Sequence, residues 1–124
     1  MTLADPCATA AHHEKADQFA RQGAALLVLV CAPVQGHKIP VWEQELSCGA
    51  AGMNLLTAAH ALGFVGGWIT GWQAYSPMVR NAFCEDGERI AGFFFIGHPG
   101  VELTDRPRPQ LDAISRRWSP PKQF

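Results

Sequence analysis

Residues 47–71 read SCGAAGMNLLTAAHALGFVGGWITG, and this stretch is the most informative part of the chain. Its first part, up to Leu62, is rich in alanine and leucine and predicts a core helix packed with small residues. Gly63 is the residue type that most often ends a helix. A short strand, Val65–Thr70, follows and stops at Gly71. Glycine at a strand end leaves backbone N–H groups accessible and lets a flat ligand come close, so we expect a planar group to bind there.

The helix in this stretch is expected to run from Val41 to Leu62, directly after Pro40, a residue type that favours the start of a helix. From Cys48 onward nearly every residue is apolar or small, so every side of the helix needs cover. A central position within one chain or a second subunit can provide that cover. We expect a dimer interface, and complete burial inside one chain is the alternative.

Further apolar runs predict strands. Ala24–Ala32, AALLVLVCA, has the length and composition of a strand that is buried on both faces. Arg89–Ile96 predicts a second buried strand. Shorter helices are expected over Glu14–Gln22, Pro77–Phe83 and Leu111–Trp118. The 124 residues predict a single domain over residues 1–124, with a flexible segment over residues 1–13.

The composition argues against several classes of partner. The net charge is −1 and no basic stripe appears, so we expect no nucleic acid. The longest apolar run, Ala24–Pro33, is too short to span a membrane, and the N-terminus has no signal-peptide pattern. Cys31 and Cys48 lie in apolar or small-residue segments, where free thiols act as small hydrophobic groups. We therefore expect a cytoplasmic protein.

Motifs for side-chain catalysis and metal binding are missing from the sequence. No HExxH spacing follows His12-His13-Glu14, so no metal site is expected. Gly63–Gly67 joins a helix to a strand, the reverse of a dinucleotide-binding fingerprint. No Ser–His–Asp set, nucleophile elbow or zinc-deaminase set is present, and we predict no catalytic side chain.

Two arginines, Arg106 and Arg108, alternate with prolines in Thr104–Pro109, TDRPRP. In an extended segment alternate residues point to the same side, and prolines reduce the entropy lost on binding. Guanidinium groups suit phosphate, so the pair is a candidate anion clamp. An ordinary solvated loop is an equally good interpretation of these residues alone. His37 and Lys38, before the long helix, are likewise open to a pocket or a solvent position.

Three segments resemble, in order, the FMN-dependent nitroreductase family. They are HKIPVWEQELSCGAAGMNLLTAAHALGFVGGWITG (residues 37–71), SPMVRNAF (76–83) and ERIAGFFFIGHP (88–99). The resemblance is greatest to the short, single-domain NAD(P)H nitroreductases and extends over about Glu14–Trp118. It implies an α+β fold with a mixed sheet flanked by helices, and a homodimer with FMN at the subunit interface.

The resemblance also implies a reaction and a set of binding residues. FMN would accept a hydride from NAD(P)H and pass reducing equivalents to nitroaromatics, quinones or similar small-molecule acceptors, without a catalytic side chain. Arg106 and Arg108 match the C-terminal basic residues that hold the flavin phosphate. A backbone N–H near the strand end would meet flavin N5. Four residues match that strand end: Trp68, Ile69, Thr70 and Gly71.

One family feature is missing. Family members begin with a helix that carries an Arg-(Arg)-Ser-x-Arg motif, and Met1–His13 holds no equivalent. The resemblance therefore implies a nitroreductase chain without its N-terminal third. Each charge-assisted hydrogen bond lost in this way would cost about 1.5–3 kcal/mol. Two functions follow from this sequence: an FMN-dependent oxidoreductase, or a non-catalytic nitroreductase-fold module for dimerisation or ligand binding.

Overall fold

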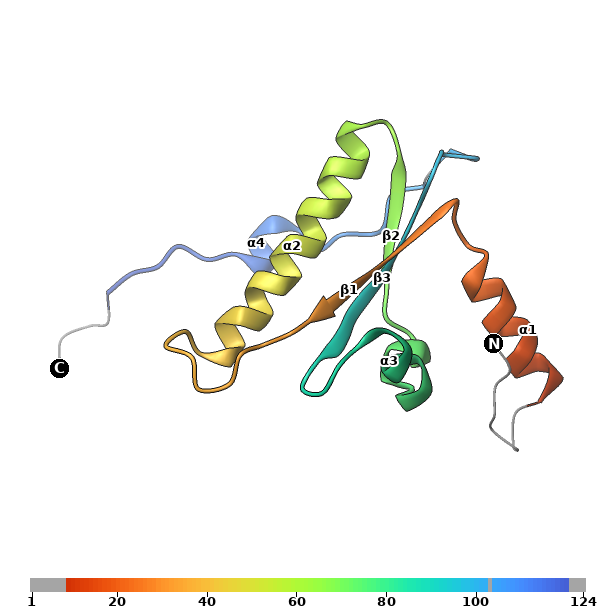
Figure 1. Ribbon diagram of the computed structural model, residues 1–124. Coiled ribbons are helices and arrows are strands. Elements are labelled where there is room, and N and C mark those ends of the chain that lie inside the picture. The colour runs from red at the N-terminus through yellow and green to blue at the C-terminus, as the bar shows by residue number, and fades with distance from the viewer. Residues whose placement is uncertain (1–8, 103, 121–124) are drawn as a thin grey trace.

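The computed structural model describes residues 9–102 and 104–120 of the chain. Figure 1 shows a small sheet with the long helix α2 on one face, helices α1 and α3 toward the other, and a C-terminal arm that leaves the body. The elements in chain order are α1 (Ala10–Ala20), β1 (Ala25–Cys31), α2 (Val41–Ala61), β2 (Val65–Ile69), the 3₁₀ helix η1 (Trp72–Tyr75), α3 (Pro77–Phe83), β3 (Arg89–Gly97) and α4 (Leu111–Ile114).

The sheet has the strand order β1-β3-β2. The predicted α+β class is confirmed, but the sheet differs from the expected mixed one in the described part of the chain, where both pairings are antiparallel. The reason is the position of β3. β1 and β2 run in the same direction and are joined through α2, but β3 lies between them and pairs with each in the opposite direction.

The core lies on both faces of β3, as the sequence predicts for this strand. Phe93 and Phe95 pack edge-on against Phe19 of α1, with ring centroids 5.2 and 5.0 Å apart. Phe94 faces α2 and is fully buried. The prediction that β1 is buried on both faces is wrong, because β1 is an edge strand and Leu26 is 42% exposed.

Helix α2 ends as predicted, with Gly63 directly after its C-cap at φ +84°. Gly52 and Ala59 are its buried residues, and they face the sheet. Its outer face carries exposed Leu46 and Met53, so complete burial inside one chain is wrong.

Two helices differ from their predicted bounds. α1 begins at Ala10, so residues 10–13 are helical where a flexible segment is expected; residues 1–8 lie outside the described part. α4 ends at Ile114, well before Trp118, since a short helix without packing partners is marginal in water. α3 starts at Pro77 as predicted, although the Ser76 side chain makes no capping hydrogen bond. Within the described residues, no helix has the length and hydrophobicity needed to cross a membrane.

Candidate functional site

The predicted strand end is a sharp turn at Gly71. β2 ends at Ile69, and Gly71 adopts φ +56°, a conformation that favours glycine, before η1 begins at Trp72. A Cβ at position 71 would also collide with the side-chain oxygen of Gln73. Gly71 is exposed, and among the described residues no backbone carbonyl accepts a hydrogen bond from its N–H. This turn therefore offers a main-chain donor on an exposed residue.

The side chains of Trp68 and Ile69 point away from such a ligand position. The Trp68 indole packs against Phe94, with ring centroids 5.1 Å apart, and donates a hydrogen bond of 3.1 Å to the carbonyl of Ala91. Ile69 packs against the core on the opposite face. Thr70 is half-buried. In this structure the strand end can therefore serve a ligand through the backbone of Thr70 and Gly71, with Trp68 and Ile69 holding that backbone in place.

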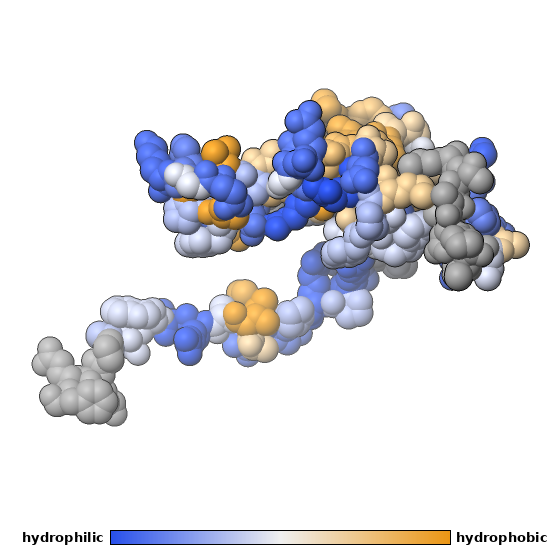
Figure 2. Space-filling model, turned by 60° about the horizontal axis from the view of Figure 1, so that its bottom comes forward, coloured by the Kyte–Doolittle hydropathy of each residue, from blue (hydrophilic) through white to orange (hydrophobic). Residues whose placement is uncertain are grey.

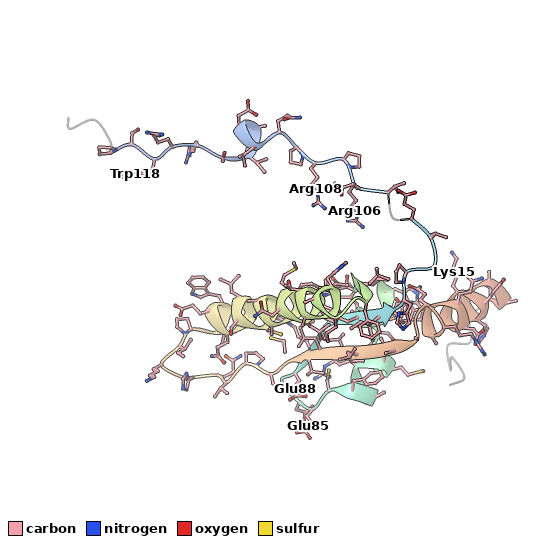
Figure 3. All side chains as sticks on the ribbon, turned by 90° about the horizontal axis from the view of Figure 1, so that it is seen from above. Lys15, Glu85, Glu88, Arg106, Arg108 and Trp118 are labelled. Atoms are coloured by element: carbon pink, nitrogen blue, oxygen red, sulfur yellow. The ribbon has the colours of Figure 1, made fainter. Side chains whose placement is uncertain are left out.

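Arg106 and Arg108 lie on the C-terminal arm, here defined as residues 104–120. Both arginines are exposed, and Figure 3 shows their side chains pointing to the same side of the extended arm, as predicted. The Asp105 carboxylate accepts a hydrogen bond from the Arg106 backbone N–H at 2.8 Å, and lies 3.4 Å from Arg108 Nη2. The local geometry therefore leaves both guanidinium groups accessible to an anion, with one held beside a carboxylate.

The predicted strand end at Gly71 and the predicted phosphate-binding arginines on the arm do not lie together within one chain. Gly97, from which the arm departs, pairs with Val65 at the start of β2. Gly71 lies two residues beyond the other end of that strand, which is ~13 Å long from Val65 to Ile69. Figure 3 shows the arm standing clear of the sheet and α2. A site that uses both halves requires the arm to move or a second copy to contribute.

A cleft of about 530 Å³ at the start of β2 was not predicted. Residues of β2 and β3, among them Gly67 and Phe95, line it together with Arg21 and His98. Of the predicted site residues in the described chain, only Ile69 lines it. Its signal in the sequence is Gly67, because a glycine in a strand can leave an open surface above it, and a Cβ at this position would meet no atom within 4 Å.

In the described part of the chain, the predicted loop residues His37 and Lys38 belong to no metal-binding cluster. His37 Nδ1 accepts a hydrogen bond from the Ile39 N–H at 3.1 Å, and both His37 and Lys38 are exposed in a loop. Across residues 9–102 and 104–120, no group of three His, Cys, Asp or Glu side chains could hold a metal ion.

The description "Nitroreductase family" belongs to a family model that matches residues 2–98. The chain belongs to the nitroreductase family. This match confirms the resemblance; it begins before Glu14 and does not test residues 99–118. It includes Trp68–Gly71 but not the arm, so it carries no information about Arg106 and Arg108.

Two named nitroreductases are among the similar proteins. The chain is 42% identical over 83 residues to "Putative NAD(P)H nitroreductase YdjA" of Escherichia coli (strain K12), covering 65% of this chain and 45% of that protein. It is 40% identical over 70 residues to "Putative NAD(P)H nitroreductase" of Haemophilus influenzae, covering 56% of this chain and 38% of that protein. The matched segments thus span less than half the length of these relatives.

A solved nitroreductase fold is also similar. The crystal structure of a nitroreductase-like family protein from Bacillus cereus matches with a TM-score of 0.71 at 20% identity, covering 85% of this chain and 56% of that one. At this identity the match establishes the fold alone. It confirms the nitroreductase-like α+β fold.

Proposed function

We propose that the protein is an FMN-dependent oxidoreductase that acts as a homodimer and uses NAD(P)H. The family match and the names of the E. coli and H. influenzae relatives support this reaction class. The observation that carries the proposal is the turn at Gly71. Gly71 is exposed, and no backbone carbonyl of the described residues accepts a hydrogen bond from its N–H, which is therefore available to a ligand.

The residues fit a flavin at the strand end. When bound, FMN supplies hydride acceptance from NAD(P)H and reduction of a nitroaromatic, quinone or similar acceptor. The Gly71 N–H would donate a hydrogen bond to the ring system, and the Trp68 side chain would hold the strand that positions it. Arg106 and Arg108 would bind the phosphate as paired cations.

The apolar surfaces support a homodimer. The outer face of α2 exposes Leu46 and Met53, which are 63% and 55% exposed. Figure 2 shows the hydrophilic arm interrupted by an apolar cluster at α4, where Leu111 and Ile114 are 74% and 66% exposed. A second copy that packs on α2 and contacts the arm would bury both apolar surfaces. Helix α2 would then be buried on all sides, as its composition predicts.

Flavin content tests this function. The purified protein is expected to be yellow and to release FMN on denaturation. The flavin absorbance and the intact mass together give the number of FMN molecules per chain. Size-exclusion chromatography with light scattering is expected to give a dimer. A colourless protein that takes up no added FMN would overturn the proposal.

The separation of the Gly71 turn from Arg106 and Arg108 favours a second candidate, a non-catalytic module with the nitroreductase fold that dimerises or binds a ligand. It predicts a folded dimer that does not oxidise NAD(P)H. Steady-state consumption of NADPH with a quinone acceptor, lost on removal of FMN, would exclude this candidate.

A further inference from the structure

Two cysteines from different elements meet where β1 packs against α2. Cys31 is the last residue of β1 and is 4% exposed, and Cys48 is half-buried on α2. Both line one cavity of about 300 Å³. Both cysteines are free, and the Cys31 thiol lies close enough to Cys48 to raise the pKa of the Cys48 thiol. Two free thiols that face one cavity from adjacent elements can form a disulfide when their sulfurs approach to bonding distance.

An ion pair fixes the same register between strand and helix. Arg89 is the cross-strand partner of Cys31, and Glu45 lies about one helical turn before Cys48. Arg89 Nη2 and Glu45 Oε1 are 2.7 Å apart. The neighbours of the two cysteines are thus joined across the same interface, which keeps the thiols opposite each other.

The loop between the two elements is also held. Gln44 of α2 accepts a hydrogen bond from the Val34 N–H at 2.8 Å through Oε1. Its Nε2 donates to the carbonyls of Val34 at 3.1 Å and Ile39 at 2.9 Å. One side chain therefore fastens the β1–α2 loop at two points beside the cavity.

We propose that Cys31 and Cys48 are a dithiol modification site that hydrogen peroxide converts to a disulfide. The Cys48 sulfur, the more accessible of the two, attacks one peroxide oxygen; the O–O bond breaks, and Cys48 becomes a sulfenic acid. The released hydroxide takes up the thiol proton to form water. The Cys31 sulfur then attacks the Cys48 sulfur and displaces the oxygen as a second water, and the S–S bond forms. Two thiols are oxidised and one peroxide is reduced.

The surroundings of Cys48 set the pH dependence of this reaction. Burial raises the pKa of the Cys48 thiol, the neighbouring Cys31 thiol raises it further, and the Arg89 guanidinium opposes both. At neutral pH most Cys48 therefore holds its proton and reacts slowly. The oxidation rate is expected to rise with pH, because the thiolate is the nucleophile.

Peptide mapping tests the site directly. Trypsin cuts after lysine and arginine, so it places Cys31 in peptide 22–38, Cys48 in peptide 39–80 and Cys84 in peptide 81–89. The protein is treated with hydrogen peroxide, its remaining thiols are blocked, and the non-reduced digest is analysed by mass spectrometry. The expected product is peptide 22–38 linked to peptide 39–80, in a protein that has lost two hydrogen atoms.

Single variants establish the order of the steps. In Cys31→Ser, Cys48 is expected to accumulate as a sulfenic acid that dimedone traps. In Cys48→Ser, the Cys31 peptide is expected to stay reduced. Cys84→Ser is the matched control, since Cys84 is also half-buried, and it should form the Cys31–Cys48 link as the parent does. The proposal is overturned if the parent forms no 22–38 to 39–80 link, or if its main disulfides join two molecules or involve Cys84.

Discussion

The indole of Trp68 occupies the space that a side chain at position 92 would need. A Cβ on Gly92 would overlap the Trp68 ring at Nε1 and Cδ1. The far edge of the same ring lies against Gly52 of α2, where a built Cβ would be 3.2 Å from Cη2. The indole N–H donates to the carbonyl of Ala91. One side chain thus joins β2, β3 and α2 at the strand that leads to the Gly71 turn.

Replacing Gly92 by alanine is therefore expected to destabilise the fold. The added methyl group would displace the Trp68 ring, and overpacking of this kind costs about 1–3 kcal/mol of unfolding free energy. Urea denaturation measures the loss. Gly67→Ala is the matched control, because a Cβ at Gly67 in the neighbouring strand meets no atom within 4 Å. Equal losses in the two variants would contradict the proposed fit.

Trp68→Phe tests the hydrogen bond to Ala91. The variant keeps an aromatic ring but leaves a partly buried carbonyl without its donor, which costs about 1–3 kcal/mol. Trp118→Phe, on the arm with 78% of the residue exposed, is expected to change stability by less than about 0.5 kcal/mol. If both variants unfold at the same urea concentration as the parent, the hydrogen bond contributes nothing to stability.

Element bounds could be predicted where a single residue marks them. Gly63 ends α2 and Pro77 begins α3, because a positive φ suits glycine and a fixed φ suits proline at a helix start. Burial was harder to predict. The run in β1 is as apolar as a central strand, but its exposure depends on which strands pair with it, and that pairing involves residues far along the chain.

The parts of the candidate site that depend on neighbouring residues could be predicted, but the distance between them could not. The turn at Gly71 follows from a glycine at a strand end, whereas the distance to Arg106 depends on the direction that the chain takes after Gly97. An isolated Gly92 within an aromatic strand was a usable signal of a close approach. No spacing rule could have paired Cys31 with Cys48, since only the packing of α2 on the sheet brings them together.

Replacing Arg106 and Arg108 together by alanine is expected to weaken FMN binding without unfolding the protein. A charge-assisted hydrogen bond contributes about 1.5–3 kcal/mol, so the dissociation constant should rise at least about tenfold for each arginine. Stability should change by less than about 0.5 kcal/mol, because both residues are exposed. Fluorescence titration with FMN and urea denaturation measure the two effects.

A second pair on the same arm provides the control for charge. Arg116 and Arg117 are also exposed, and their double alanine variant removes the same number of positive charges. It should bind FMN as the parent does. A similar loss of affinity in both double variants would indicate general electrostatic attraction, and the assignment of a phosphate clamp to Arg106 and Arg108 would fail.

The raised thiol pKa values predict a loss of stability in alkali. Burial raises the pKa of both Cys48 and Cys84 above the ordinary value of 9.0. A group whose pKa is higher in the folded state stabilises that state fully below the unfolded value, and this contribution disappears as the pH rises through the folded pKa. With reducing agent present, the unfolding free energy should therefore fall as the pH rises above 9.0. In urea denaturation, the unfolding free energy of Cys48→Ser should fall less with pH than that of the parent, and that of the double variant with Cys84→Ser should fall least. If both variants show the same decrease with pH as the parent, these thiols are not the cause of the decrease.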